Sequence, residues 1–284
     1  MIRSFHHSQY ALERLLEGKR ETVTVVLPTR EVADTIGPIV ERLRGLAPLI
    51  DQILVVDAAS GDGTAEIAAA RGAEVHQESE LLPDFGPVLG KGDAMWRALA
   101  VARGELVVYL DSDTPDFSPH FATGLLGPLV CERDVRFVKG HFRRPFTAPD
   151  GREYPSDGGR VTELTAKPLL SAFFPDLAGF IQPLAGEVAA PRELFERLPF
   201  ATGYAVETAM LLHARDALGG TDGMAQVDLE LRRNRHQPLS DLAPMAREVL
   251  GAVLERLAAE GRLLQGGHEP PVERPPYATL SAHA

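Results

Sequence analysis

The hydrophobic residues in the first part of the chain follow two alternating patterns. Short apolar runs over residues 22–27, 52–56, 73–76 and 106–110 are typical of strands that are buried on both faces of a parallel sheet. Between these runs, hydrophobic residues recur at the spacing of a helix. Strands that alternate with helices in this way indicate βαβ units. The pattern therefore predicts an α/β fold, with a mostly parallel central sheet flanked by helices.

The remaining segments predict further elements around this sheet. We expect a short amphipathic helix over residues 7–19, before the first strand. Later elements are, in chain order, a strand over 135–142, helices over 161–174, 191–198 and 205–218, a strand over 223–231 and a long helix over 242–264. Residues 266–284 are rich in Pro, Gly and His, which is typical of a tail.

Composition narrows the class of partner and the cellular compartment. The formal net charge of −11 argues against a nucleic-acid partner, because phosphate backbones are bound by basic faces. The single cysteine, Cys131, excludes an internal disulfide and a zinc site built from cysteines. No signal-peptide core and no apolar run of about 18 residues is found. We therefore expect a cytoplasmic protein without a membrane partner.

Two carboxylates, Asp111 and Asp113, directly follow the apolar run 106–110. Open α/β sheets bind ligands at the carboxyl ends of their strands, and burying unpaired carboxylates there would be costly. A positive group should therefore meet them, and Mg²⁺ or Mn²⁺ carrying a diphosphate is the candidate. The alternative is a helix N-cap or a solvated turn, because Asp and Ser are common in both.

The link after the first predicted strand excludes two common nucleotide-binding motifs. It reads PTRE at residues 28–31, without the G-x-G-x-x-G that lets a dinucleotide approach the backbone. The Gly-Lys pair at Lys91 lacks the preceding spacing and the Ser/Thr of a P-loop. A nucleotide must therefore be held in some other way.

Several motifs occur in an order that points to a known enzyme family. They are PTRE at 28–31, DAASGDGT at 57–64, GKGDAMW at 90–96, DSD at 111–113, FRRP at 142–145, GGRVTEL at 158–164, QPLAGE at 182–187 and GYAVE at 203–207. Over residues 22–242 the chain resembles the glucosyl-3-phosphoglycerate and mannosyl-3-phosphoglycerate synthases, which are retaining glycosyltransferases of the GT-A fold. GGRVTEL with QPLAGE is the specific part of this resemblance, whereas DSD alone is common.

The resemblance implies the transfer of glucose or mannose from GDP-mannose, GDP-glucose or UDP-glucose to D-3-phosphoglycerate, with Mg²⁺ or Mn²⁺ as cofactor. It also implies a homodimer. The expected division of the chain is an N-terminal helix (1–20), a nucleotide-sugar-binding half (21–145), an acceptor-binding half (146–264) and a flexible tail (265–284). The alternatives are a related transferase with a lipid-phosphate or polysaccharide acceptor, and a non-catalytic sensor of sugar nucleotides.

The resemblance implies a set of residues for the nucleotide sugar, which are Pro28, Thr29, Arg30, Glu31, Asp57, Ser60, Lys91, Asp111, Ser112 and Arg232. For Glu31 and Asp57 the alternative is a charge that faces a helix N-terminus. Besides Asp111 and Asp113, the family supplies a histidine to the metal. An ungapped alignment puts Asn234 at that place and His236 two residues later, so either His236 or Asn234 completes the predicted metal site.

The acceptor and the sugar are expected to meet in the second half of the chain. Gly159, Arg160 and Thr162 match the family's acceptor site, and a helix start with a guanidinium and a hydroxyl suits an anion. The alternative is a helix start with a solvated Arg160. The predicted catalytic residues are Asp113, Leu184, Glu187 and Glu207. Retention by front-face attack with support from the Leu184 carbonyl, and double displacement on either glutamate, both remain open.

Overall fold

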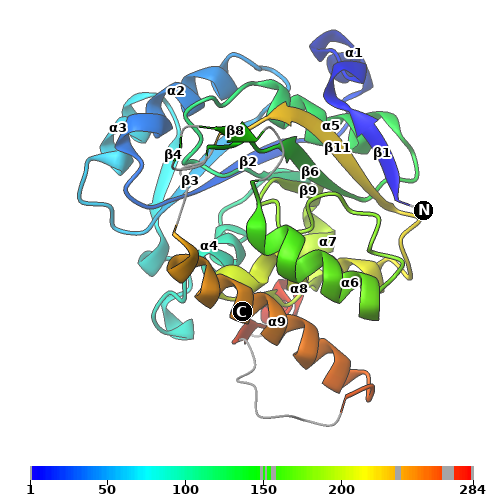
Figure 1. Ribbon diagram of the computed structural model, residues 1–284. Helices are drawn as coiled ribbons and strands as arrows, with labels where there is room; N and C mark the ends of the chain where they lie inside the picture. Colours follow the sequence, from blue (N-terminus) through cyan, green and yellow to red (C-terminus); the bar gives the residue numbers. More distant parts are fainter. Residues whose placement is uncertain are drawn as a thin grey trace.

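A computed structural model describes residues 2–147, 150, 152–154, 158–233, 238–263 and 272–282. Within them, a sheet of eight strands in the order β1-β11-β6-β9-β5-β2-β3-β4 crosses the molecule (Figure 1). Its strands, in chain order, are β1 (Arg3–His6), β2 (Val23–Thr29), β3 (Gln52–Asp57), β4 (Glu74–Gln77), β5 (Leu106–Tyr109), β6 (Phe137–Arg143), β9 (Val188–Pro191) and β11 (Met224–Leu231). All pairings are parallel except those of β9 with β5 and β6. The predicted fold class is confirmed.

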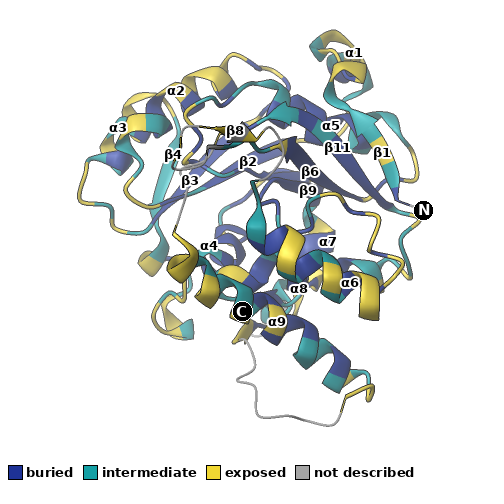
Figure 2. Cartoon of the chain, viewed as in Figure 1, coloured by how far each residue is buried: buried dark blue, intermediate teal, exposed yellow. Residues whose placement is uncertain are grey.

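Helices cover both faces of this sheet (Figure 1). One face carries α1 (Leu12–Gly18), α2 (Ala33–Arg44), α3 (Thr64–Ala70) and α5 (His120–Cys131). The other carries α4 (Lys91–Ala98), α6 (Lys167–Phe173), α7 (Arg192–Arg197), α8 (Val206–Ala217) and α9 (Leu239–Ala259). Successive side chains of a strand point to opposite faces, so Val25 packs in the first core and Val26 in the second. Burial on both faces explains the nearly continuous apolar runs, and Figure 2 shows the sheet as the buried middle layer.

Short elements complete the described chain. Two small antiparallel sheets pair β7 (Phe146–Thr147) with β8 (Glu153–Tyr154), and β10 (Phe200–Ala201) with β12 (Glu273–Arg274). Short 3₁₀ helices are η1 (His7–Gln9), η2 (Glu78–Glu80), η3 (Pro83–Phe85), η5 (Gly203–Ala205) and η6 (Tyr277–Ala282), and η4 (Thr162–Ala166) is a short π-helix.

The N-terminal segment differs from the single predicted helix. β1 pairs in parallel with β11 at the edge of the central sheet, and α1 begins only at Leu12. The sequence of β1, RSFH, is mostly polar, so it lacks the apolar run that identified the other parallel strands. β9 is likewise absent from the prediction, because its sequence VAAP contains one β-branched residue and two alanines.

Residues 272–282, which belong to the predicted tail, pack against the core in the structure. The Arg274 guanidinium donates to the buried carboxylate of Asp93, with 2.7 Å between Nη2 and Oδ2. The indole of Trp96 donates to the carbonyl of Pro275 at 2.9 Å. A composition rich in Pro and Gly describes how a segment departs from helix and strand, but it does not reveal a specific buried ion pair.

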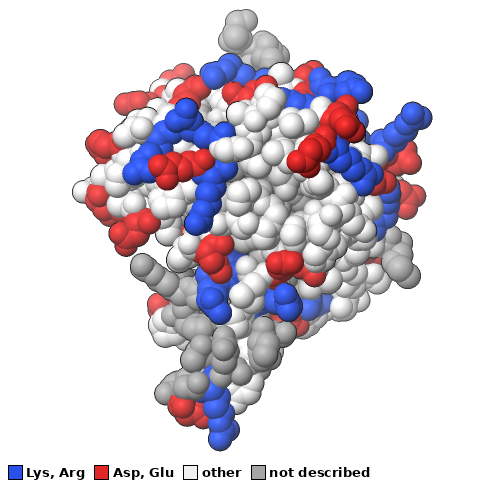
Figure 3. All heavy atoms as spheres, turned by 90° about the horizontal axis from the view of Figure 1, so that it is seen from above, with Lys and Arg blue, Asp and Glu red and all other residues white. Residues whose placement is uncertain are grey.

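Charges of both signs share the molecular surface. On the face in Figure 3, lysines and arginines are interspersed with acidic side chains, without a continuous basic surface among the described residues. Exposed pairs such as Arg103 with Glu74 contribute at most about 1 kcal/mol each to stability. A search of the described helices finds none with the length and apolar character that a membrane crossing requires.

Candidate active site

A cavity of about 920 Å³ opens at the carboxyl ends of β2 and β5. This is the edge at which an open α/β sheet binds ligands, and the volume suits a small-molecule site. Its walls come from both expected halves of the chain. The predicted site residues that line it are Pro28, Thr29, Arg30, Lys91, Asp111, Ser112, Asp113, Gly159, Arg160, Thr162, Leu184, Glu207 and Arg232.

The loop that carries Asp111 and Asp113 is fixed to its neighbours by hydrogen bonds. The Ser112 hydroxyl donates to the carbonyl of Pro28, at the end of β2, over 2.6 Å. The Thr35 hydroxyl, from α2, donates to the Ser112 carbonyl over 2.6 Å. These bonds use Ser112 to hold the loop, and they leave the two flanking carboxylates to face the cavity.

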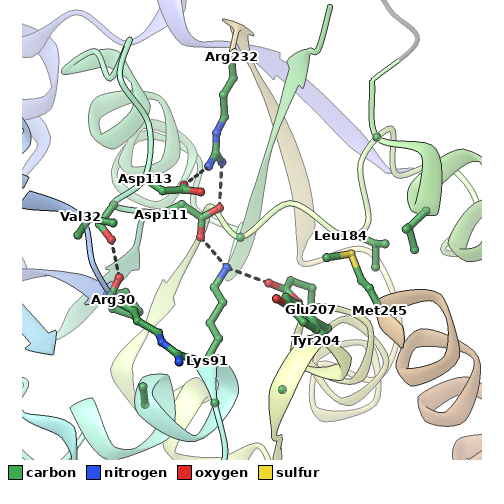
Figure 4. A pocket seen from close by; sticks show the side chains of 18 of the residues that line it. Arg30, Val32, Lys91, Asp111, Asp113, Leu184, Tyr204, Glu207, Arg232 and Met245 are labelled. Carbon is green, nitrogen blue, oxygen red and sulfur yellow. Dashed lines mark hydrogen bonds and ion pairs between the residues drawn. The ribbon is translucent and has the colours of Figure 1, made fainter. Parts of the chain in front are cut away.

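Arg232, just beyond β11, joins the carboxylates of the site. Its guanidinium donates to Asp111 Oδ2 and to Asp113 Oδ1, each at 3.0 Å (Figure 4). It also pairs with Glu187. Burial alone would lower the pKa of Arg232, but the three carboxylates raise it. The positive group expected beside Asp111 and Asp113 is therefore present in the protein itself.

Lys91, at the start of α4, bridges the two sides of the cavity. Its Nζ donates to Asp111 Oδ1 at 2.5 Å and to Glu207 Oε1 at 3.0 Å (Figure 4). Burial would lower the pKa of Lys91, but Asp111 and Glu207 outweigh that effect and raise it. For Asp111, burial would raise the pKa, whereas Lys91 and Arg232 together bring it below its usual range. Both groups therefore stay charged near neutral pH.

Glu187 lies beneath Arg232 and does not line the cavity. Burial raises the pKa of its carboxyl against the opposing effect of Arg232, and its second oxygen has no hydrogen-bond partner among the described residues. The side chain therefore pairs with Arg232 and does not face the cavity. Glu207, by contrast, faces the cavity beside Lys91 and Tyr204 (Figure 4).

Three predicted nucleotide contacts also lie outside the cavity lining. Asp57 is fully buried and accepts hydrogen bonds from the hydroxyls of Thr29 and Ser60, at 2.9 and 2.7 Å. The Glu31 backbone N–H donates to Ser60 Oγ at 2.9 Å, and Glu31 Oε1 accepts from the N–H of Gly61 at 2.8 Å. The loops after β2 and β3 are therefore held together by Glu31, Asp57 and Ser60. The residues of this region that line the cavity are Thr29, Arg30 and Val32.

Glu78 is a cavity residue that the sequence analysis missed. It directly follows β4, and burial raises the pKa of its carboxyl. The rule that ligands meet the carboxyl ends of parallel strands would have found it, had it been applied to this short strand as it was to β5.

The far wall of the cavity is rich in arginine. Gly159, which has a φ of +76°, begins the turn that leads into η4, and the N–H of Gly158 donates to the carbonyl of Arg144 at 2.9 Å. Arg144 lines the cavity, and its buried Nε has no hydrogen-bond partner among the described residues. Arg160 lies over the ring of Phe146. Two guanidinium groups beside a turn that leads into a helix suit a small anion.

The cluster at Asp111 and Asp113 fits a divalent cation. Carboxylate oxygens are the ligands that Mg²⁺ and Mn²⁺ prefer, and the Asp113 side chain is 65% exposed, so it can take a cation at little desolvation cost. Lys91 and Arg232 make ion pairs with the four carboxylates of this cluster. The third predicted ligand, His236 or Asn234, lies outside the described residues.

Comparison with known proteins places these features in a family. The model of the glycosyl transferase family 2 matches residues 24–156. Glucosyl-3-phosphoglycerate synthase from Mycolicibacterium smegmatis is 44% identical over 236 residues, which cover 83% of this chain and 77% of that protein. The crystal structure of mannosyl-3-phosphoglycerate synthase from Rubrobacter xylanophilus has a TM-score of 0.90 at 49% identity, covering 98% of this chain and 97% of the other.

A further structure shows a relative with ligands. It is glucosyl-3-phosphoglycerate synthase from Mycobacterium tuberculosis in complex with Mn²⁺, UDP-glucose and phosphoglyceric acid. Its TM-score is 0.86 at 36% identity, and the match covers 98% of this chain and 99% of that one. The predicted GT-A fold is confirmed by this agreement. Together with the sequence identity across most of both chains, it shows that the protein belongs to the glucosyl- and mannosyl-3-phosphoglycerate synthase family of glycosyltransferases.

Proposed function

We propose that this protein transfers a hexose from a nucleoside diphosphate sugar to a hydroxyl group of D-3-phosphoglycerate. The observation that carries the proposal is the arrangement of one cavity, in which Lys91, Asp111 and Arg232 lie between the loops after β2 and β3 and the arginine-rich wall. The first side suits a nucleotide and the second a small anion. A relative with 36% identity binds UDP-glucose and phosphoglyceric acid.

The donor is proposed to lie along the ends of β2, β3 and β5. Thr29, Arg30 and Val32 would face the nucleoside, and Lys91 and Arg232 would face the diphosphate. A divalent cation held by Asp111 and Asp113 would supply charge neutralisation of that diphosphate. Val32 and the neighbouring loop are where the choice between uracil and guanine would be made, because they form the wall on this side.

The acceptor is proposed to lie against Arg144, Gly159, Arg160 and Thr162. A carboxylate and a phosphate need several donors, and guanidinium groups offer them in pairs. The buried Nε of Arg144 supports this placement, because a donor without a described partner at a cavity wall is satisfied when an anion binds.

We propose that the transfer retains the anomeric configuration. In a front-face displacement, the bond from the anomeric carbon to the diphosphate breaks as that carbon bonds to the acceptor oxygen, and the acceptor proton passes to the diphosphate. Leu184 and Glu207 line the cavity between the two proposed ligands. Double displacement on a glutamate is the alternative. Glu207 lines the cavity and Glu187 does not, which favours Glu207 as the nucleophile in that case.

A donor panel tests the proposal. Purified protein is incubated with Mn²⁺ or Mg²⁺, 3-phosphoglycerate and, in turn, UDP-glucose, GDP-glucose and GDP-mannose, and release of the nucleoside diphosphate is followed. We expect release that depends on both metal and acceptor. The anomeric proton coupling in the product, measured by NMR, should show the donor's configuration. A product of inverted configuration would disprove retention. Equal release of the nucleoside diphosphate with and without 3-phosphoglycerate would disprove that this compound is the acceptor.

Asp113→Asn provides the matched test of the site. It should lower kcat/KM by about 100-fold or more, because it removes one of two proposed cation ligands. Asp176→Asn, which changes a surface partner of Arg215 in the same way, should leave the rate unchanged. Equal rates for both variants would contradict the proposed role of Asp113.

Other expectations stay predictions from the sequence. They are the homodimer, the cytoplasmic location and the lack of a nucleic-acid partner. Size-exclusion chromatography with light scattering measures the first directly.

A further inference from the structure

Two histidines and a glutamate converge at the edge of the central sheet, away from the cavity described above. His6 ends β1, His7 begins η1, and Glu230 lies in the irregular part of β11, where the register with β6 shifts. β1 and β11 lie side by side in Figure 1. One ligand atom from each of the three residues lies within 4.8 Å of the other two. The fold thus gathers side chains that are more than 200 positions apart in the sequence.

The distances in this cluster are those of ligands around a single cation. Glu230 Oε1 lies 3.1 Å from His7 Nε2 and 4.0 Å from His6 Nε2. Ligand atoms of a tetrahedral zinc ion with bonds of about 2.1 Å are separated by roughly 3.4 Å. The observed values bracket that separation, so small side-chain rotations bring all three atoms into place.

Packing already orients the three side chains. The His7 ring stacks on His120, with 4.0 Å between ring centroids, and His120 is itself fixed through Nε2 to the Leu229 carbonyl at 3.0 Å. The buried Nε2 of His7 has no partner among the described residues other than Glu230 Oε1, at 3.1 Å. A cation would satisfy this nitrogen.

Glu230 is held in place by an unusual backbone. Its φ is +68°, which is uncommon for a residue with a side chain, and its N–H donates to Asp228 Oδ1 at 2.8 Å. Such strain is maintained where it serves a purpose. Here it turns the Glu230 carboxylate toward β1.

The partner of His6 fits a metal-bound ring. His6 Nδ1 lies 2.8 Å from the Ser8 hydroxyl and 3.2 Å from the Ser8 N–H. In the structure Nδ1 accepts from the Ser8 N–H. When Nε2 binds a cation, the ring proton moves to Nδ1, so the bond from the Ser8 N–H is given up and Nδ1 donates to the Ser8 hydroxyl instead. A hydrogen bond from the second ring nitrogen is the usual companion of a metal-bound histidine, because it fixes the orientation of the ring.

We propose that His6, His7 and Glu230 form a binding site for a first-row transition-metal cation such as Zn²⁺. Two imidazoles and one carboxylate suit zinc, cobalt or nickel, whereas Mg²⁺ and Ca²⁺ prefer oxygen ligands throughout. The side chains of His6 and Glu230 are 42% and 46% exposed, so a cation can enter and water can complete the coordination. The bound cation fastens β1, at the edge of the sheet, to β11.

Calorimetric titration of Zn²⁺ into the full chain tests the site, in excess Mg²⁺ so that the carboxylates of the cavity are occupied. We expect one high-affinity zinc per chain. Glu230→Gln and His7→Gln should each weaken it by at least about tenfold, because each removes a ligand. His76→Gln is the matched control, since His76 pairs with Glu74 at 3.0 Å without a second histidine in the cluster. It should bind zinc as the unchanged protein does.

A second readout separates a specific site from loose surface binding. Zinc should raise the melting temperature of the unchanged protein and of His76→Gln, and leave that of Glu230→Gln unchanged, because a cation that binds the folded state stabilises it. Co²⁺ in the site should give the strong visible absorption of a four-coordinate ion, and Glu230→Gln should lose it. Zinc affinity that is unchanged in both Glu230→Gln and His7→Gln, or absent from the unchanged protein, would overturn the proposal.

Discussion

Arg232 shows what a single residue contributes to the site. Its planar guanidinium reaches Asp111, Asp113 and Glu187, which lie beyond β5 and at the start of β9. A lysine could not form this fork, since its charge is compact and its donors share one atom. The resemblance predicted that Arg232 contacts the nucleotide sugar, but it did not predict the three carboxylate partners, because these come from segments that only the fold brings together.

Lys139 is a second buried charge, and the sequence analysis did not single it out. It lies in β6, whose sequence alternates between apolar and other residues, so a lysine there is expected to point to solvent. In the structure its Nζ donates to the Ala185 carbonyl at 2.7 Å. Burial lowers its pKa from 10.5 to about 8, although nearby carboxylates such as Glu207 oppose the shift. The residue therefore links β6 to the loop that carries Leu184. Removing its ammonium group from water destabilises the charged form, which is why the pKa falls.

This cost predicts a pH dependence of stability. Between pH 8 and about 10.5 the unfolded chain holds a proton on Lys139 that the folded chain has lost, so the free energy of unfolding should rise with pH in that window. The contribution is on the order of 3 kcal/mol across the window. Lys139→Met should remove it. Urea unfolding of both proteins from pH 7.5 to 10.5 measures the difference, and parallel curves would contradict the expectation.

At the scale of elements, the sequence predicts the strands and helices that have a clear pattern of hydrophobic residues. The parallel strands β2, β3 and β5 have apolar runs because helices cover both of their faces. Their carboxyl ends were therefore located from the sequence, and with them the cavity residues Thr29, Arg30 and Asp111. β9 lacks such a run, yet it enters the middle of the sheet between β5 and β6. Its antiparallel direction brings the QPLAGE loop beside the end of β5. Without β9, the place of Leu184 and Glu187 could not be predicted.

Gly186, directly before β9, predicts a variant that separates activity from folding. A Cβ at this position would overlap Asp111 Oδ1 and Lys91 Nζ, which are mobile ends of side chains. Gly186→Ala should therefore displace the ion pair and lower kcat/KM by about 100-fold, as displacements of about 1 Å do. Circular dichroism melting should show little change in stability.

Gly223→Ala is the control for this prediction. A Cβ there would meet Leu218 and Arg136 at ordinary contact distances of 3.5 and 3.8 Å, far from the cavity lining. Its rate should equal that of the unchanged protein. A Gly186→Ala variant with full activity would show that the ion pair of Lys91 and Asp111 does not need its present geometry.

At the scale of the whole molecule, contacts between residues far apart in the sequence hold the C-terminal segment to the core, and no local sequence pattern indicates them. Arg274 pairs with Asp93, 181 positions earlier, and also donates to the Phe85 carbonyl at 2.8 Å. Arg144 and Tyr204 lie within the motifs FRRP and GYAVE but were not among the predicted site residues, and Glu78 lies outside every motif, so the motifs predicted only part of the lining. Long-range pairs depend on the complete topology, whereas motifs depend on neighbouring residues.

Arg274→Met tests the importance of this closure. It should lower the free energy of unfolding by about 3 kcal/mol, because the fully buried carboxylate of Asp93 loses its strongest partner and retains Arg97. Arg103→Met removes the exposed pair with Glu74 and should cost at most about 1 kcal/mol. Urea unfolding compares the two. Equal decreases in the free energy of unfolding for the two variants would show that the buried pair contributes no more to stability than the exposed pair.

The contact between Arg274 and Asp93 also has a consequence for synthesis of the protein. Asp93 stands two residues after Lys91, and Arg274 holds the carbonyls of the loop that leads to it. A nascent polypeptide that ends before position 274 lacks this anchor, and the loop before Lys91 loses the bonds that Arg274 makes to it. Because Asp93 is fully buried, we expect such an incomplete translation product to fold less stably than the full chain.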